Sequence, residues 1–160
     1  MPSVIKRHPL KKFFMLMAIW FVTIMAVFAG SVLYEQYQSS EYDAIAGPYI
    51  RAIIPEISKW DPATTQALMA PEVAATISSE NFIQAMAWFS RLGALQSMQE
   101  PKFDQIHQDQ QTEFGKQTIV AYDIDAKYEN GDAVINLKLL ERGNSLEIYR
   151  FDFRSEILIE

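Results

Sequence analysis

A long apolar run without charge near the N-terminus constrains this chain more than any other feature of its sequence. From Phe13 to Leu33 no side chain carries a formal charge. At ~1.5 Å per residue, a helix over this run would span about 30 Å, the thickness of the hydrocarbon core of a bilayer. We therefore predict a transmembrane helix at residues 13–33, with the lipid bilayer as its partner.

The charges around this run predict the orientation of the helix. The net charge of −6 divides into +4 for residues 1–12 and −10 for the rest, because every acidic residue follows Leu33. Basic residues beside a spanning helix favour the cytoplasmic side. We expect residues 1–12 to be a cytoplasmic segment and the larger C-terminal part to lie across the membrane. The orienting residues are Lys6, Arg7, Lys11 and Lys12.

A cleaved signal peptide is an alternative interpretation of the same segment. Signal peptides also combine a basic start with an apolar stretch, and Val27-Phe28-Ala29 before Gly30 is an acceptable cleavage site. Their apolar part usually covers only about 7–15 residues, so the length of this run favours an uncleaved anchor. Cleavage near Ala29 would give a secreted periplasmic domain instead.

A helical pattern follows the apolar run. We predict a juxtamembrane helix at residues 34–47, a break at Gly47-Pro48, and a domain at residues 48–160. An apolar stripe begins the domain, formed by Ile50, Ile53, Ile54 and Ile57. We expect a kink at Pro55. Three further helices are expected at residues 62–69, at residues 71–77, and from Ser78 or Ser79 to Leu92, with Gly93 as the end of the last.

Beyond Gly93 the apolar period changes from 3.6 to 2, which indicates strands. Alternation predicts strands at residues 119–128, 133–141 and 146–158, with Tyr149, Phe151, Phe153 and Ile157 on one face of the last. A weaker strand is expected at residues 94–107, closed by a loop at residues 108–112. Asn130-Gly131 predicts a type I′ hairpin turn. The fold class is therefore α+β, with helices packed on a curved four-stranded antiparallel sheet.

The order of helices followed by long antiparallel strands resembles the cystatin-like, nuclear-transport-factor-2-like (NTF2-like) α+β superfamily. Residues 88–103 in particular look like the helix-to-strand junction of small membrane-anchored bacterial domains of that group. Leu92-Gly93 would end the helix and turn the chain into the sheet. The resemblance implies a bacterial inner-membrane protein with a periplasmic domain, and it carries over no catalytic residue.

The residue types that carry chemistry are sparse. The chain has no cysteine and only His8 and His107, so thiolate sites are excluded and no histidine pair exists in the domain. Asp123 and Asp125 share a strand face with Lys127, and we interpret them as solvated. We expect no catalytic residue, no cofactor and no metal. The acidic domain also argues against nucleic acid as a partner.

Two kinds of surface are candidates for binding. The leading prediction is a non-enzymatic interaction module of an envelope complex, whose partners are other envelope proteins or further copies of the chain. Its partner face would be the outer side of the sheet: Asn136, Lys138, Arg150, Asp152 and Arg154. The alternative is a small-molecule binder or enzyme with a pocket between helices and sheet. That pocket would be lined by Phe82, Met86, Phe89, Tyr122, Tyr149 and Phe151.

Overall fold

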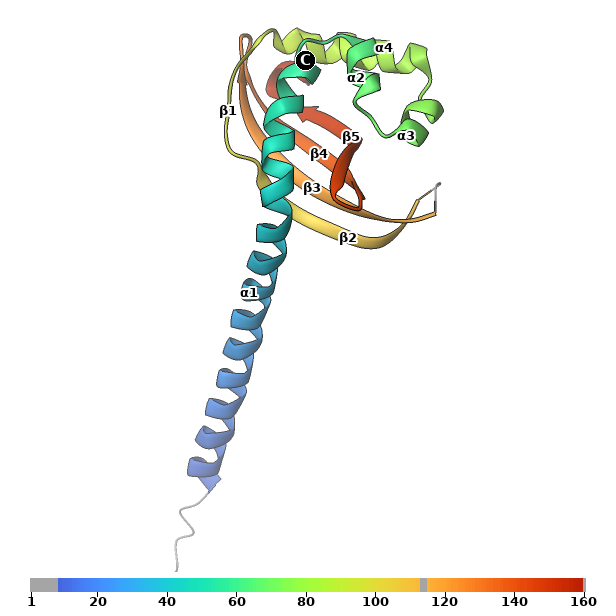
Figure 1. Ribbon diagram of the computed structural model, residues 1–160. Coiled ribbons are helices and arrows are strands. Elements are labelled where there is room, and N and C mark those ends of the chain that lie inside the picture. The colour runs from blue at the N-terminus through green and yellow to red at the C-terminus, as the bar shows by residue number, and fades with distance from the viewer. Residues whose placement is uncertain (1–8, 113–114, 160) are drawn as a thin grey trace, which may run out of the picture. The chain divides into compact units, whose positions relative to one another are not determined.

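The computed structural model describes residues 9–112 and 115–159, apart from the side chains of residues 9–13, 31–41, 109 and 110. The chain divides into two compact units, Met1–Glu41 and Tyr42–Glu160. Helix α1 (Pro9–Ile57) contributes to both units (Figure 1). The remaining elements are α2 (Pro62–Ala67), α3 (Pro71–Thr76), α4 (Ser79–Phe89), the 3₁₀ turn η1 (Ser90–Leu92), β1 (Leu95–Met98), β2 (Lys102–Thr112), β3 (Gly115–Tyr128), β4 (Asp132–Arg142), β5 (Ser145–Arg154) and the 3₁₀ turn η2 (Glu156–Leu158).

The first unit contains the beginning of α1. All side chains described there, from Phe14 to Gly30, are exposed, and most are apolar. Among the described residues, no helix is both long enough and apolar enough to cross a membrane. The transmembrane helix predicted at residues 13–33 therefore stays a prediction.

The end of α1 forms one wall of the core of the second unit. The isoleucine stripe is confirmed, since Ile50, Ile54 and Ile57 are fully buried and Ile53 is 4% exposed. The break predicted at Gly47-Pro48 is wrong, because α1 continues through Pro48 to Ile57. An interior proline costs a helix ~3 kcal/mol. Burial of each of the four isoleucines contributes ~1.5–3 kcal/mol, so the stripe offsets the cost of the two interior prolines, Pro48 and Pro55.

The three short helices predicted after α1 are confirmed. Proline stands in the first turn of α2 and of α3, where its missing N–H is not needed. Asp61 caps α2 by accepting a hydrogen bond from the backbone N–H of Thr64 at 2.9 Å. Helix α4 and the turn η1 end at Gly93, whose φ is +80°, as the sequence predicts.

The strands form one antiparallel sheet in the order β1-β3-β4-β5, with β2 also paired to β3. The sheet has five strands, so the prediction of four is wrong. In place of the single strand predicted at residues 94–107, β1 and β2 lie end to end along the same strand, β3. Pro101 stands between them and has no backbone N–H for the sheet, which interrupts the pairing.

Strand β2 also extends further than predicted. Residues 108–112, predicted as a loop, belong to β2, and Thr112 pairs with Gly115 of β3. Strand β3 begins at Gly115 rather than at residue 119, so it offers a backbone partner to these polar residues. Backbone pairing does not require apolar side chains, and the alternation of apolar residues therefore missed this part of the hairpin.

The hairpin predicted between β3 and β4 is confirmed, but its turn is not of type I′. Neither Asn130 nor Gly131 has the positive φ that this turn requires. The backbone N–H of Asn130 instead donates to the carbonyl of Leu92 at 3.0 Å. A Cβ on Gly131 would lie 2.8 Å from Cγ1 of Ile157. Contacts with η1 and with the C-terminal residues thus determine this turn.

Strand β5 is shorter and less regular than predicted. It ends at Arg154, and Ile157 belongs to η2. Leu139 pairs with Ile148 but Lys138 pairs with Arg150, so Tyr149 is an extra residue in a β-bulge. The bulge changes which residues face the core: Leu146 and Ile148 are buried before it, and Phe153 is buried after it.

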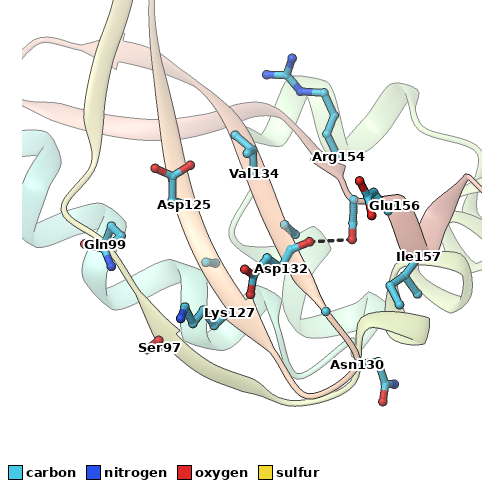
Figure 2. A pocket seen from close by; sticks show the side chains of 14 residues that line it. Ser97, Gln99, Asp125, Lys127, Asn130, Asp132, Val134, Arg154, Glu156 and Ile157 are labelled. Atoms are coloured by element: carbon cyan, nitrogen blue, oxygen red, sulfur yellow. Dashed lines mark hydrogen bonds between the residues drawn. The ribbon is translucent and has the colours of Figure 1, made fainter.

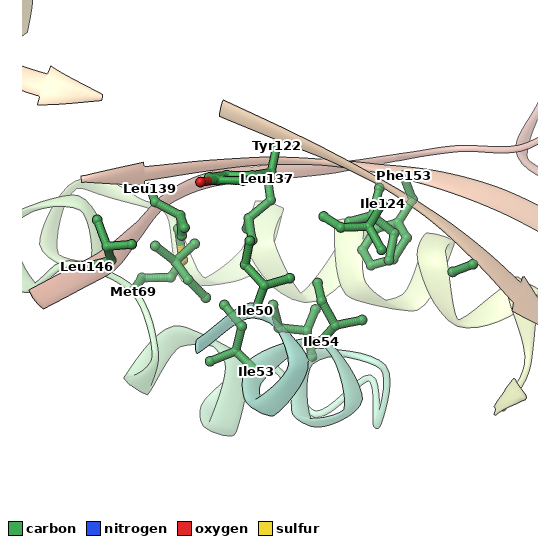
Figure 3. Packing of buried hydrophobic residues seen from close by; sticks show 14 of the residues in the cluster. Ile50, Ile53, Ile54, Met69, Tyr122, Ile124, Leu137, Leu139, Leu146 and Phe153 are labelled. Carbon is green, nitrogen blue, oxygen red and sulfur yellow. The ribbon is translucent and has the colours of Figure 1, made fainter. Parts of the chain in front are cut away.

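The core of the second unit lies between the inner face of the sheet and the helices. Isoleucines of α1 pack toward Tyr122, Leu137 and Leu139 of the sheet (Figure 3). Met69, Met86 and Phe153 belong to the same buried cluster. The burial alternation predicted for β3 is confirmed from Tyr122 to Tyr128. Ile119, Val120 and Ala121 are all buried, so the two faces of β3 differ in burial only in its second half.

Candidate functional site

An open groove of about 440 Å³ lies between α3, α4 and the edge strand β5. Its walls are mainly apolar, and Arg150 is the one charged residue among those that line it. Volumes of a few hundred Å³ with a few polar groups are typical of ligand sites. The apolar wall residues are Met69, Val73, Ile77, Phe82, Ala85, Phe89 and Phe151, joined by Thr76 and Tyr149.

The structure brings four of the six predicted pocket residues to this groove: Phe82, Phe89, Tyr149 and Phe151. The other two lie elsewhere, because Met86 and Tyr122 are fully buried in the core. The centre of the space between helices and sheet is filled by side chains, so the groove lies at the margin, beside β5.

Helix α4 positions two aromatic walls of the groove. Phe82 and Phe89 are two turns apart on α4 and therefore share a face. The Phe82 ring meets Phe151 edge to face, with centroids 6.4 Å apart. The Phe89 ring packs against the rings of Phe151 and Phe153, with centroids 6.3 and 4.9 Å apart. Aromatic contacts of this kind hold the rings in place, so this side of the groove is preformed.

Two tyrosines of β3 have perturbed pKa values through burial. Desolvation raises the pKa of Tyr122, and its hydroxyl donates to Oδ1 of Asp43 at 3.0 Å. Burial also raises the pKa of Tyr128 to about 12, against a smaller opposite effect of its hydrogen bond with Ser58. Both hydroxyls join α1 and the residue after it to the sheet, which is a structural role.

The predicted partner residues do share the outer side of β4 and β5. Asn136 pairs with Asp152, and Lys138 pairs with Arg150, in directly opposite positions. Asn136 donates through Nδ2 to Oδ1 of Asp123 at 2.8 Å. Arg154 lies 3.5 Å from the same oxygen. The face therefore has an internally bonded part around Asp123 and a cationic pair, Lys138 and Arg150.

The carboxylates predicted to be solvated, Asp123 and Asp125, have different partners. Asp123 is bonded to Asn136, and Asp125 forms an ion pair with Lys102 at 2.6 Å. The hydrogen bond and charge of Asp125 raise the pKa of Lys102. The two carboxylates therefore act separately, as partners of surface cations.

A second hollow, larger and more polar, lies at the Asn130 end of the sheet. Its volume is about 840 Å³. Figure 2 shows Asp125, Lys127, Asp132, Arg154 and Glu156 around it, so both charge signs are present. Ser155 Oγ donates to the carbonyl of Asp132 at 2.6 Å, which ties the end of β5 to the start of β4.

The remaining predicted residues do not come together with the groove. His107 lies within β2, opposite Ile119. His8, Lys6 and Arg7 lie outside the described residues, as do the side chains of Lys11 and Lys12. In the described part of the chain, no cluster of His, Asp and Glu could hold a metal ion.

Sequence reasoning missed Arg150 as a groove residue, together with Met69, Val73 and Ile77. The alternation assigned Arg150 only to the outer face, because the bulge at Tyr149 has no signature in the apolar pattern. The helical segments that contain Val73 and Ile77 were predicted, but only tertiary packing places them beside β5.

A third feature adjoins the groove, at the edge of the sheet. The backbone N–H of Ala70 donates to the carbonyl of Ile148 at 2.9 Å, and Met69 forms a parallel bridge with Ile148. The segment between α2 and α3 thus covers the start of the β5 edge.

Comparisons with protein-family models, with curated proteins and with solved structures give no match to this chain.

Proposed function

We propose that the chain is a non-enzymatic, single-pass protein of a bacterial inner membrane, with a periplasmic α+β domain that acts as an interaction module of an envelope complex. The uncharged sequence of residues 13–33 and the basic residues before it support the anchor and its orientation. The exposed apolar side chains from Phe14 to Phe28 are consistent with lipid contact. Resemblance to the cystatin-like, NTF2-like superfamily remains part of this proposal.

The observation that carries the interaction role is the cationic pair on the outer face. Lys138 and Arg150 are directly opposite each other, and no ion pair to either is found in the described part of the chain. Like charges in this position destabilise a sheet. A partner with an acidic group would remove that repulsion, so the pair favours a binding surface.

The polar groups of the domain support a role without catalysis. Tyr122 and Tyr128 use their hydroxyls in contacts that join α1 and the residue after it to the sheet. Asp123 and Asp125 neutralise or bond surface residues. These contacts give each group a structural role.

The anchor and its orientation can be tested by cysteine labelling, because the natural chain has no cysteine. Single variants Ser3→Cys and Gln84→Cys are treated in whole cells with a membrane-impermeant maleimide. We expect labelling of the exposed position 84 and protection of position 3. Labelling of both positions would contradict the anchor. Intact mass of the mature protein tests the alternative of cleavage after Ala29.

The interaction role can be tested by purification of the full chain from native membranes in mild detergent. We expect another envelope protein, or further copies of the chain, to co-purify. The double variant Lys138→Glu/Arg150→Glu should lose that association, while Lys127→Glu, which changes another cation, should keep it. A monomer without any co-purifying protein would contradict the proposed function.

A second candidate function, binding of a small molecule, is favoured by the groove beside β5. The groove has about 440 Å³ and contains four of the predicted pocket residues. Native mass spectrometry of the full chain tests this candidate. A bound species that is lost when Ala85→Phe fills the groove would support it, and an unliganded mass would contradict it.

A further inference from the structure

The edge of the sheet beside the groove has backbone groups available for pairing. Strand β5 is the last in the order β1-β3-β4-β5. Its partner beyond β4, among the described residues, is the segment Met69–Ala70, which pairs only at Ile148. An open strand edge is a template for another strand, so residues 149–154 offer a continuation of this pairing.

The groove lies where the inner side chains of an added strand would point. Tyr149 and Phe151 of β5 form one wall, and Phe82, Phe89 and Ile77 stand opposite or beside them. Side chains of a strand alternate between the two faces of a sheet. A strand placed next to β5 would therefore direct every second side chain into this apolar groove.

The outer face next to the same edge carries positive charge. Arg150 is exposed and lies opposite Lys138. An acidic side chain on the outer face of an added strand, beside Arg150, would form a cross-strand pair of opposite charge, which stabilises a sheet. The groove favours apolar side chains on the inner face of an added strand, and the cationic pair favours an acidic side chain on its outer face.

From these features we infer that β5 binds an extended segment of a partner protein as an added strand, an inference that rests on the proposed interaction role. Apolar side chains at alternate positions of the segment occupy the groove, and an Asp or Glu between them faces Arg150. Main-chain hydrogen bonds to β5 supply affinity and the groove supplies specificity, as in strand addition generally.

A random-peptide phage library tests this inference on the full chain in lipid nanodiscs. Peptides are selected on the natural chain. Their binding to the variant Ala85→Phe, in which the new side chain fills the groove, is then measured. Gln84→Phe is the matched control, because Gln84 is exposed on the same helix and does not line the groove. We expect enriched peptides to alternate apolar residues with at least one acid. Their affinity should fall about tenfold or more in Ala85→Phe and remain unchanged in Gln84→Phe.

Hydrogen exchange distinguishes an added strand from other occupants of the groove. Binding of an enriched peptide should slow exchange of backbone amides in residues 149–154. Peptides without alternation, equal affinity for Ala85→Phe, or unchanged exchange in β5 would overturn the inference, and so would a selection that enriches nothing. If Ala85→Phe does not fold, Thr76→Trp fills the groove from its exposed rim and serves the same purpose.

Charge variants test the acidic position of the segment. Arg150→Glu should weaken the enriched peptide about tenfold, and Lys127→Glu should leave its affinity unchanged. Equal affinity for Arg150→Glu would contradict this part.

Failure of the strand site and failure of the proposed function remain distinct. A native partner retained by Ala85→Phe but lost in Lys138→Glu/Arg150→Glu overturns only the strand site. If the library gives binding peptides but no protein co-purifies with the chain from native membranes, only the envelope role is overturned.

Discussion

A buried hydrogen bond joins Ser58, the residue after α1, to β3. Ser58 Oγ lies 2.8 Å from the hydroxyl of Tyr128. The Tyr128 ring packs against Trp60 and Phe153, with centroids 5.6 and 6.1 Å apart. If either hydroxyl is removed, the other is left buried without a partner, which costs ~1–3 kcal/mol.

We expect Ser58→Ala to lower the free energy of unfolding by about 1–3 kcal/mol, because it leaves the Tyr128 hydroxyl unpaired. Urea titration of the full chain in micelles, followed by tryptophan fluorescence, measures this change. The double variant Ser58→Ala/Tyr128→Phe is the control. Its free energy of unfolding should fall by less than the summed changes of the two single variants. An additive result would contradict the pairing.

The raised pKa values of Tyr122 and Tyr128 predict that the free energy of unfolding falls at alkaline pH. Their pKa values are raised in the folded protein, that of Tyr128 from 10.0 to about 12. Between these two values the folded tyrosine holds more protons than the unfolded one, so the free energy of unfolding falls as pH rises. Urea titrations from about pH 9 upward should show this fall, and Tyr128→Phe should make it shallower. A slope unchanged by Tyr128→Phe would contradict the assignment.

At the scale of elements, the joint between the helices and the sheet depends on Gly93. Its φ of +80° and ψ of −156° lie in a region that is essentially restricted to glycine. A Cβ there would lie 2.9 Å from Cβ of Glu129 in the β3–β4 turn. The carbonyl of Gly93 also accepts a hydrogen bond from the indole of Trp60 at 2.8 Å. Three segments therefore meet at one backbone position.

We expect Gly93→Ala to lower the free energy of unfolding by about 1–3 kcal/mol, since both the backbone and the close contact oppose a Cβ. The matched control is Gly143→Ala in the β4–β5 turn, where φ is also positive but no atom lies within 4 Å of the added Cβ. That variant should lose less. Thermal unfolding followed by circular dichroism compares the two, and equal losses would show that the contact with Glu129 is unimportant.

Most elements could be predicted because their signals are local. The isoleucine stripe of α1 and the alternation from Tyr122 to Tyr128 report burial directly, since burial selects apolar residues at the period of each element. The errors concern features set by distant partners. The turn at Gly131 depends on Leu92 and Ile157, and the polar end of β2 depends on the early start of β3.

At the scale of the whole molecule, charge is the feature that governs the proposed topology. The basic residues of 1–12 precede the apolar run, and the acidic residues all follow it. If the basic residues orient the helix, then Lys6, Arg7, Lys11 and Lys12 changed together to Glu should reduce or invert the orientation. Labelling of Ser3→Cys from outside the cell, absent in the parent, would report the inversion. Unchanged labelling in this variant would contradict the role of these residues.

The candidate site could be predicted only in part. Phe82, Phe89, Tyr149 and Phe151 were expected to line a pocket because they share apolar faces, and they do meet in one groove. Tyr122 was expected there too, yet it lies in the filled core. Periodicity identifies the buried face of an element, but it does not show where two such faces leave space between them.

Three properties of this chain are readable from its residues alone: the uncharged run of residues 13–33, the separation of charge along the chain, and the change from helices to strands at Gly93. These properties depend on residue type and spacing within a few turns of the chain. Contacts between distant segments set the bulge at Tyr149, the division of one predicted strand into β1 and β2, and the open edge of β5 beside its groove. Each of these depends on which distant segment supplies a hydrogen bond or fills a space, and a local pattern of residues does not record that choice.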